Sequence, residues 1–105
     1  MEPPVNAKAA LLQALIRGEG YGLELIERVK QRTQGTVKLH QGNTYPALRE
    51  LEKEGLLTSW DADPTPERGG RPRRYYKLTA AGQRAAMQQS VAVAGLFGLV
   101  PEVAQ

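Results

Sequence analysis

The sequence predicts a mainly α-helical protein with a small β-hairpin, arranged as a winged helix-turn-helix with an added C-terminal dimerisation helix. Two observations predict this fold. Helix-forming segments with apolar positions at helical spacing occupy the first half of the chain, and after Gly55 the pattern changes to that of strands. The resulting order of three helices, a hairpin and a helix is that of a winged helix-turn-helix.

The first helix is predicted over residues 7–17, where strong helix formers predominate. Its apolar face is expected to consist of Leu11, Leu12, Leu15 and Ile16. Gly18 and Gly20 then interrupt the helical pattern.

The second helix is predicted from about Tyr21 to Gln34. Apolar residues at helical spacing oppose charged ones along it, and the apolar positions are Leu25, Ile26 and Val29. Gly35 follows its end, as is typical of a residue just past a helix terminus. A brief β-compatible stretch comes next, at residues 36–39.

The third helix ends near Glu54, but its start has two alternatives. If Asn43 is the N-cap, Pro46 falls in the first turn, where a missing N–H is harmless. If the helix starts earlier, with His40 as the N-cap, Pro46 bends it. The residues expected to face inward are Tyr45, Leu48 and Leu51.

Two strands are predicted after the third helix, at residues 56–62 and 73–78, where aromatic and apolar residues are frequent. The segment between them is rich in proline and glycine, which predicts a hairpin with a long tip. Thr79 is a good N-cap for a fourth helix. The chain therefore divides into a winged helix-turn-helix domain at residues 1–79 and a dimerisation helix with its tail at residues 80–105.

The composition excludes several classes of function. The chain has 105 residues, no cysteine and one histidine, which excludes a disulfide framework and a thiolate metal site. His40 has no evident nucleophile or metal ligand beside it, so we expect no catalytic activity, metal or cofactor. Residues 1–4 do not open a signal peptide, and the apolar run at residues 91–100 is too short to span a bilayer. We expect a cytoplasmic protein.

The net charge of +3 is small, but the cations are unevenly distributed. A run without an intervening acid crosses the predicted hairpin and consists of Arg68, Arg71, Arg73, Arg74 and Lys77. An arginine-dense loop of this kind suits contact with phosphates or insertion into a minor groove. The alternative is a solvated edge hairpin whose charges prevent aggregation.

The start of the third helix offers hydrogen-bonding groups and a positive helix end, whereas its acids lie near its far end. We expect contacts with the major groove from Gln41, Asn43, Thr44 and Tyr45, with Lys38 and Arg49 as weaker candidates for phosphate contacts. Each of these residues also has a local interpretation. Asn43 or Thr44 could cap the helix, and Tyr45 could be a core tyrosine with a solvated hydroxyl.

The segment from Met87 to Val103 is apolar and carries almost no charge. A domain of this size cannot bury all of it against itself, and exposed apolar stretches usually mark an oligomer interface. We expect a homodimer, with interface candidates Met87, Val91, Leu96 and Phe97. The alternative is that the segment folds back on the first helix.

Five short motifs occur in order over residues 7–87: GYG at 20–22, GNTYPAL at 42–48, LEKEGL at 51–56, GRPRRYY at 70–76 and LTAAG at 78–82. With these motifs the sequence resembles the PadR family of winged-helix transcriptional regulators. The resemblance implies a dimeric repressor that binds double-stranded operator DNA and is released by a small-molecule effector.

The resemblance also implies site residues. It places Gln41, Asn43, Thr44 and Tyr45 in the major groove and assigns the wing contacts to Arg71, Arg73 and Arg74. The tail departs from family members that stack a planar ligand between subunits, because its only aromatic residue is Phe97. The alternative function is a winged-helix module for protein–protein interaction, which the salt dependence of DNA binding would distinguish.

Overall fold

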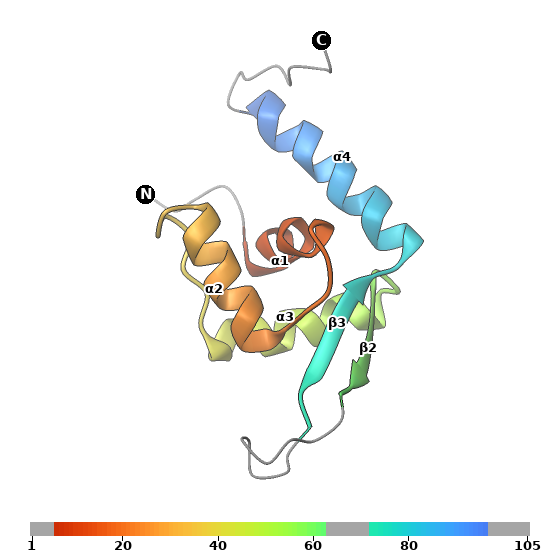
Figure 1. Cartoon of the computed structure of the whole chain (residues 1–105). Coiled ribbons are helices and arrows are strands. Elements are labelled where there is room, and N and C mark those ends of the chain that lie inside the picture. Colours follow the sequence, from red (N-terminus) through yellow and green to blue (C-terminus); the bar gives the residue numbers. More distant parts are fainter. Residues whose placement is uncertain (1–5, 63–71, 97–105) are drawn as a thin grey trace.

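A small antiparallel sheet lies beside a group of helices in the computed structural model, which describes residues 6–62 and 72–96, with side chains as far as Ser90 (Figure 1). The elements in chain order are α1 Ala7–Ile16, β1 Gly20–Tyr21, α2 Gly22–Arg32, α3 Gln41–Lys53, β2 Leu57–Asp61, β3 Arg74–Leu78 and α4 Ala80–Leu96. The predicted combination of helices with a β-hairpin is confirmed. Among the described residues, no helix has the length and apolar character needed to cross a membrane.

Helix α1 occupies the centre of the molecule and packs against α2, α3, α4 and β3 (Figure 1). It is buried on most of its sides, and its buried residues are Ala9, Ala10, Leu11, Leu12, Ala14 and Leu15. The predicted apolar face was therefore too narrow, because alanines complete the packed surface. It also wrongly included Ile16, which is 44% exposed at the end of the helix.

The turn after α1 is held by the side chain of Arg28 in α2. Its guanidinium donates hydrogen bonds to the carbonyl oxygens of Ala14 at 2.9 Å, Gly18 at 3.0 Å and Glu19 at 3.1 Å. Carbonyls at the end of a helix lack partners within the helix, so one arginine satisfies several of them. The first two helices are thereby fixed relative to each other.

Helix α2 ends slightly earlier than predicted, because Gln34 takes the first left-handed position, with φ 53°. Gly35 follows with φ 81°, and its N–H donates to the Lys30 carbonyl at 2.8 Å, as in a Schellman motif. The β-compatible stretch at residues 36–39 forms no strand. Its apolar residues Val37 and Leu39 are instead buried in the core as the chain passes to α3.

His40, rather than Asn43, is the N-cap of α3. Asn43 is the third residue of the helix, and its Oδ1 accepts a hydrogen bond from the His40 N–H at 3.0 Å. Pro46 therefore lies inside the helix, past its first turn. Of the residues expected to face inward, Leu48 and Leu51 are buried and Tyr45 is half-buried.

The sheet has the order β1-β3-β2, with every pair antiparallel. Both predicted strands are confirmed within one or two residues, but β1 was not predicted, because its two residues lie in a glycine-rich break. Leu57, Tyr76 and Leu78 are part of the core. The alternate positions along β3 carry exposed or half-buried residues.

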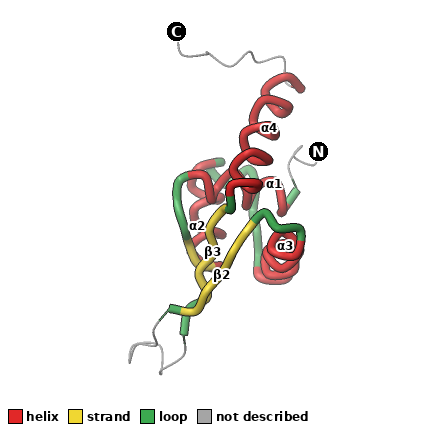
Figure 2. Tube along the Cα trace, turned by 90° about the vertical axis from the view of Figure 1, so that its right-hand side faces the viewer, coloured by secondary structure: helices red, strands yellow, loops and turns green. Residues whose placement is uncertain are grey.

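Helix α4 begins after Thr79, as predicted. The Thr79 hydroxyl accepts from the Gly82 N–H at 3.0 Å and donates to the Gly55 carbonyl at 2.7 Å. Its first half packs on α1, where Ala86 is fully buried and Gln13 donates to the Ala86 carbonyl at 2.8 Å. Figure 2 shows α4 and the β2–β3 hairpin extending from the helical body in opposite directions.

Replacing Gly82 with alanine is expected to destabilise the protein by about 1–3 kcal/mol, because the new Cβ would collide with the Leu56 carbonyl oxygen. This loss opposes the helix propensity that alanine would add. The measurement is urea-induced unfolding followed by circular dichroism. As the matched control, Gly42→Ala meets only the exposed His40 ring, so we expect a change within about 0.5 kcal/mol. Equal effects of the two substitutions would contradict the contact.

Candidate nucleic-acid interface

The start of α3 presents a polar, solvent-exposed surface without a carboxylate. Lys38, His40 and Gln41 are exposed, and Asn43 is half-buried with its Oδ1 bonded to the His40 N–H. The N–H groups at this end of the helix add a partial positive charge. The surface has the character expected of a helix end that meets phosphates and base edges.

Thr44 does not belong to this surface, which corrects its prediction as a residue that contacts bases. Its side chain has no exposed area, and its hydroxyl donates to Asn43 Oδ1 at 3.3 Å. Thr44 faces the core because it lies four and seven residues before the buried Leu48 and Leu51, on the same face of α3.

Tyr45 packs directly against the first residue of α2. A Cβ atom built on Gly22 would lie 2.5 Å from the Tyr45 hydroxyl and from one of its ring carbons. Only glycine leaves room for the ring in this position. Tyr45 is half-buried, and its hydroxyl and one edge of its ring face Gly22.

The foot of the wing, defined here as residues 72–74, brings two of the predicted arginines to the sheet. The Arg73 guanidinium lies 4.1 Å from the centre of the Tyr21 ring, in cation–π geometry. Arg74 Nη1 lies 3.0 Å from Asp61 Oδ1, with both side chains half-exposed. This hydrogen bond to Asp61 raises the pKa of Arg74 above its ordinary value. Arg68 and Arg71 lie outside the described residues.

A hollow of about 310 Å³ separates the start of α3 from the foot of the wing. Its lining comes from three segments that are distant in sequence and consists of Tyr21, Gly22, Leu23, Tyr45, Pro72, Arg73 and Arg74. The structure thus brings together Tyr45, Arg73 and Arg74 from the predicted site. It also adds Tyr21 and Gly22, which belong to the GYG motif, and Leu23, which was not a candidate for the site.

The acids near the end of α3 are partly neutralised by a lysine of α1. Lys8 Nζ in α1 lies 2.7 Å from Glu54 Oε2 and 3.7 Å from Glu50 Oε1. The hydrogen bond to Glu54 raises the pKa of Lys8. Glu52 accepts from the Ser59 hydroxyl at 2.7 Å. Arg49 is exposed on α3.

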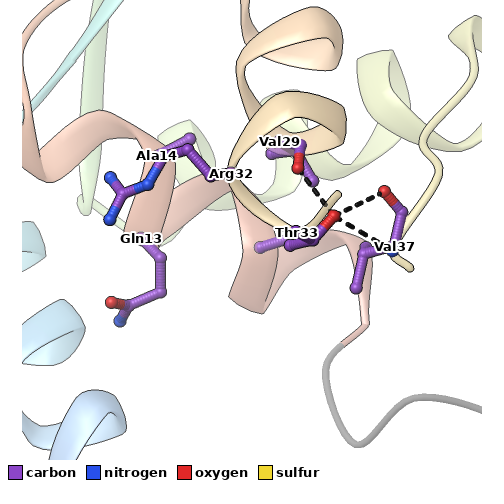
Figure 3. A pocket seen from close by; sticks show the side chains of 7 residues that line it. Gln13, Ala14, Val29, Arg32, Thr33 and Val37 are labelled. Atoms are coloured by element: carbon purple, nitrogen blue, oxygen red, sulfur yellow. Dashed lines mark hydrogen bonds between the residues drawn. The ribbon is translucent and has the colours of Figure 1, made fainter. Parts of the chain in front are cut away.

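A separate cavity of about 220 Å³ lies between α1 and the end of α2 (Figure 3). Val29, Thr33 and Val37 line one side, and the Thr33 hydroxyl donates to the Val29 carbonyl at 2.8 Å. Gln13 and Arg32 add polar groups. Among the side chains that the structure describes, no group of three acids or histidines could hold a metal ion.

Of the predicted dimerisation residues, only Met87 has a described side chain, and it is 64% exposed. The backbone of α4 continues past Met87 to Leu96. The side chains of Val91 and Leu96, and the whole of Phe97, lie outside the described residues. The structure therefore leaves one large apolar side chain of α4 uncovered, next to the buried Ala86.

The profile of the PadR-like family of transcriptional regulators matches residues 11–88. The chain belongs to this family. The match covers all five motifs and most of the first helix, so the resemblance drawn from the sequence is confirmed.

Solved structures confirm the winged helix-turn-helix fold. A transcriptional regulator from Clostridium thermocellum superposes with a TM-score of 0.74 at 22% identity, over 93% of this chain and 92% of that chain. Bacillus subtilis PadR, solved in complex with operator DNA, gives 0.73 at 22% identity, over 85% of this chain and 49% of that chain. An uncharacterized protein of Lysinibacillus sphaericus is 25% identical over 73 residues. That match covers 70% of this chain and 64% of its relative.

Replacing Gly22 with alanine is expected to cost about 1–3 kcal/mol of folding free energy, because the Tyr45 ring must move. In a Tyr45→Ala background the same substitution should be nearly neutral, since the space is then open. Urea unfolding of the four proteins of this cycle measures the coupling. An equal cost in both backgrounds would show that Gly22 and Tyr45 do not interact.

Proposed function

We propose that this PadR-like regulator is a sequence-specific DNA-binding repressor. The start of α3 reads the major groove, and the wing contacts the adjacent backbone or minor groove. The observation that supports this is the shared hollow, which brings the exposed end of α3 beside two arginines at the foot of the wing. A helix end and an arginine-bearing hairpin on one side of a molecule are suited to adjacent grooves of a duplex.

The proposed contacts follow from exposure. Gln41 and the exposed part of Tyr45 face the base edges, and Asn43 does so with its amide nitrogen, because its Oδ1 is already engaged. Lys38 and Arg49 are exposed cations on either side of this surface and contact phosphates.

The wing contacts come from Arg71, Arg73 and Arg74. Within the protein, Arg73 contacts the Tyr21 ring and Arg74 forms an ion pair with the Asp61 carboxylate. Guanidinium groups carry several donors, so both retain N–H groups for phosphate oxygens.

We also propose that the protein acts as a homodimer through α4 and the tail, with residues 1–79 as the DNA-binding part. Met87, Val91, Leu96 and Phe97 are the interface candidates, and the exposed Met87 supports this choice. Two-fold symmetry would match a palindromic operator. A small amphipathic effector would suit the cavity between α1 and α2, which has apolar walls and the polar groups of Gln13 and Arg32.

Selection of bound sequences from random duplex DNA tests the function. We expect a palindromic consensus whose half-sites lie about one helical turn, or a multiple of it, apart. If no sequence is enriched, the protein–protein interaction module becomes the better interpretation.

The effector is tested by screening aromatic and drug-like molecules for release of the selected DNA. If compounds bind the protein but none of them releases the DNA, the proposed effector is wrong.

The oligomeric state provides a direct prediction. Met87→Glu places a charge in the proposed interface and should shift the protein from dimer toward monomer in sedimentation velocity. The matched control is Ile16→Glu, which changes another exposed apolar residue at the end of α1. A wild-type monomer, or no shift with Met87→Glu, would contradict the assignment of this face.

Replacing Arg71, Arg73 and Arg74 together with alanine is expected to weaken binding to the selected duplex by about 10-fold or more. The slope of log affinity against log salt should fall by about 2–3, as fewer counterions are released. Fluorescence anisotropy at several salt concentrations measures both. The matched control replaces Arg17, Lys30 and Arg32, which are exposed cations on α2 and at the end of α1. Equal losses in both triple variants would show a general charge effect.

Substitution of Asp61 by asparagine is expected to strengthen DNA binding about 2–5-fold at low salt. It removes a negative charge at the foot of the wing and releases Arg74 from its 3.0 Å ion pair. Glu54→Gln is the matched control, because it likewise frees a cation, Lys8, but at the far end of α3. If Glu54→Gln strengthens DNA binding as much as Asp61→Asn does, the stronger binding comes from the change in net charge and not from the release of Arg74.

A further inference from the structure

At the two consecutive residues Tyr21 and Gly22, where β1 passes into α2, the chain contacts both the foot of the wing and α3. Tyr21 ends β1 and Gly22 begins α2. Arg73 of the wing lies on the Tyr21 ring, and Tyr45 of α3 lies on the Gly22 backbone. Neither residue was a candidate for DNA contact.

We propose that Tyr21 is a positioning residue that orients Arg73 for DNA, and that the Tyr21–Gly22 step thereby holds the wing and the start of α3 in one fixed relation. This inference rests on the proposed DNA-binding function and assigns a role within it.

The Tyr21 ring is itself held in place by the sheet. Tyr21 lies directly opposite Tyr75 in the β1–β3 register, and the two ring centres are 5.5 Å apart at an interplanar angle of 70°. Trp60 lies opposite Tyr75 on the other side and is stacked on it at 5.9 Å. Three aromatic rings therefore form a row across the sheet, with Tyr21 at its β1 end.

Arg73 lies where this row meets the wing. It immediately precedes β3, and its guanidinium is 4.1 Å from the centre of the Tyr21 ring, well inside the range of a cation–π interaction. The next residue, Arg74, is paired with Asp61 of β2 at 3.0 Å. Consecutive arginines are thus tied to the two outer strands of the sheet, which restricts how the foot of the wing can turn.

The same step sets the position of Tyr45. Because the Tyr45 ring fills the space where Gly22 has no side chain, a movement of the start of α2 moves Tyr45 and the Tyr21 ring together. The geometry of the hollow between α3 and the wing is therefore determined by α2, which makes no base contact in the proposed function. When the residues that contact DNA are held in position before binding, less conformational entropy is lost on binding.

A double-mutant cycle tests the role of Tyr21. Affinity for the selected duplex is measured at several salt concentrations for the wild type, Tyr21→Leu, Arg73→Ala and the double variant. If Tyr21 acts through Arg73, each single variant binds about 3–10-fold more weakly with a salt slope lower by about one. The double variant is then no weaker than Arg73→Ala alone.

Two further variants separate positioning from structure and from direct contact. Tyr21→Phe keeps the ring and should bind as the wild type does, whereas loss of affinity would indicate a DNA contact by the hydroxyl. Trp60→Leu, the matched control, shortens the same aromatic row without touching Arg73, so it should leave affinity and salt slope unchanged.

The outcomes are distinct. Three results would overturn the positioning role while leaving DNA binding in place: additive losses in the cycle, tighter binding by Tyr21→Leu, or a loss with Trp60→Leu equal to that with Tyr21→Leu.

If Tyr21→Leu fails to fold by circular dichroism, Arg73→Lys replaces it, because lysine keeps the charge but loses the planar stacking on the ring. If Arg73→Lys binds DNA with the affinity and the salt slope of the wild type, the positioning role is also overturned. A wild-type protein that binds no duplex DNA overturns the proposed function together with this inference.

Discussion

The burial of α1 is the constraint on which the rest of this structure depends. This short helix of leucines and alanines is covered by α2, α3, α4 and β3, so each neighbour is positioned by the surface it shares with α1. Alanines on its sides let the neighbouring helices approach closely. Arg28 then ties α2 to the end of α1 through three carbonyl oxygens. A recognition helix and a wing need such a rigid support, because their contacts with DNA depend on relative orientation.

The proposed DNA-binding surface is composed of segments with no common local pattern. α3 supplies its exposed start, the hairpin supplies Arg73 and Arg74, and the turn into α2 supplies the glycine and aromatic ring that hold the other two. The acids of α3 are kept at the opposite end, where Lys8 neutralises two of them. The cations Arg73 and Arg74 therefore lie near the end of α3 that carries no carboxylate.

Much of the fold could be predicted, because its elements are strongly marked in the sequence. Thr79 caps α4 as expected, and both long strands appear where aromatic and apolar residues are frequent. The errors have specific causes. A two-residue strand at Gly20 leaves no periodic signal, and His40 is a less usual N-cap than Asn43, so the start of α3 was ambiguous. Thr44 was wrongly expected to contact bases, because it lies one turn before the buried Leu48, on the face of α3 that packs into the core.

The sequence by itself determined the family, the order of the four helices and the two long strands, and the concentration of arginines on the hairpin, because these are local properties of composition and spacing. Only the tertiary structure decided which polar residues remain available. Thr44 is buried, Arg74 is paired with Asp61, and Arg73 lies on Tyr21, and each partner comes from a different turn or element. The physical reason is that exposure and pairing depend on contacts between segments distant in the chain, which no window of the sequence contains.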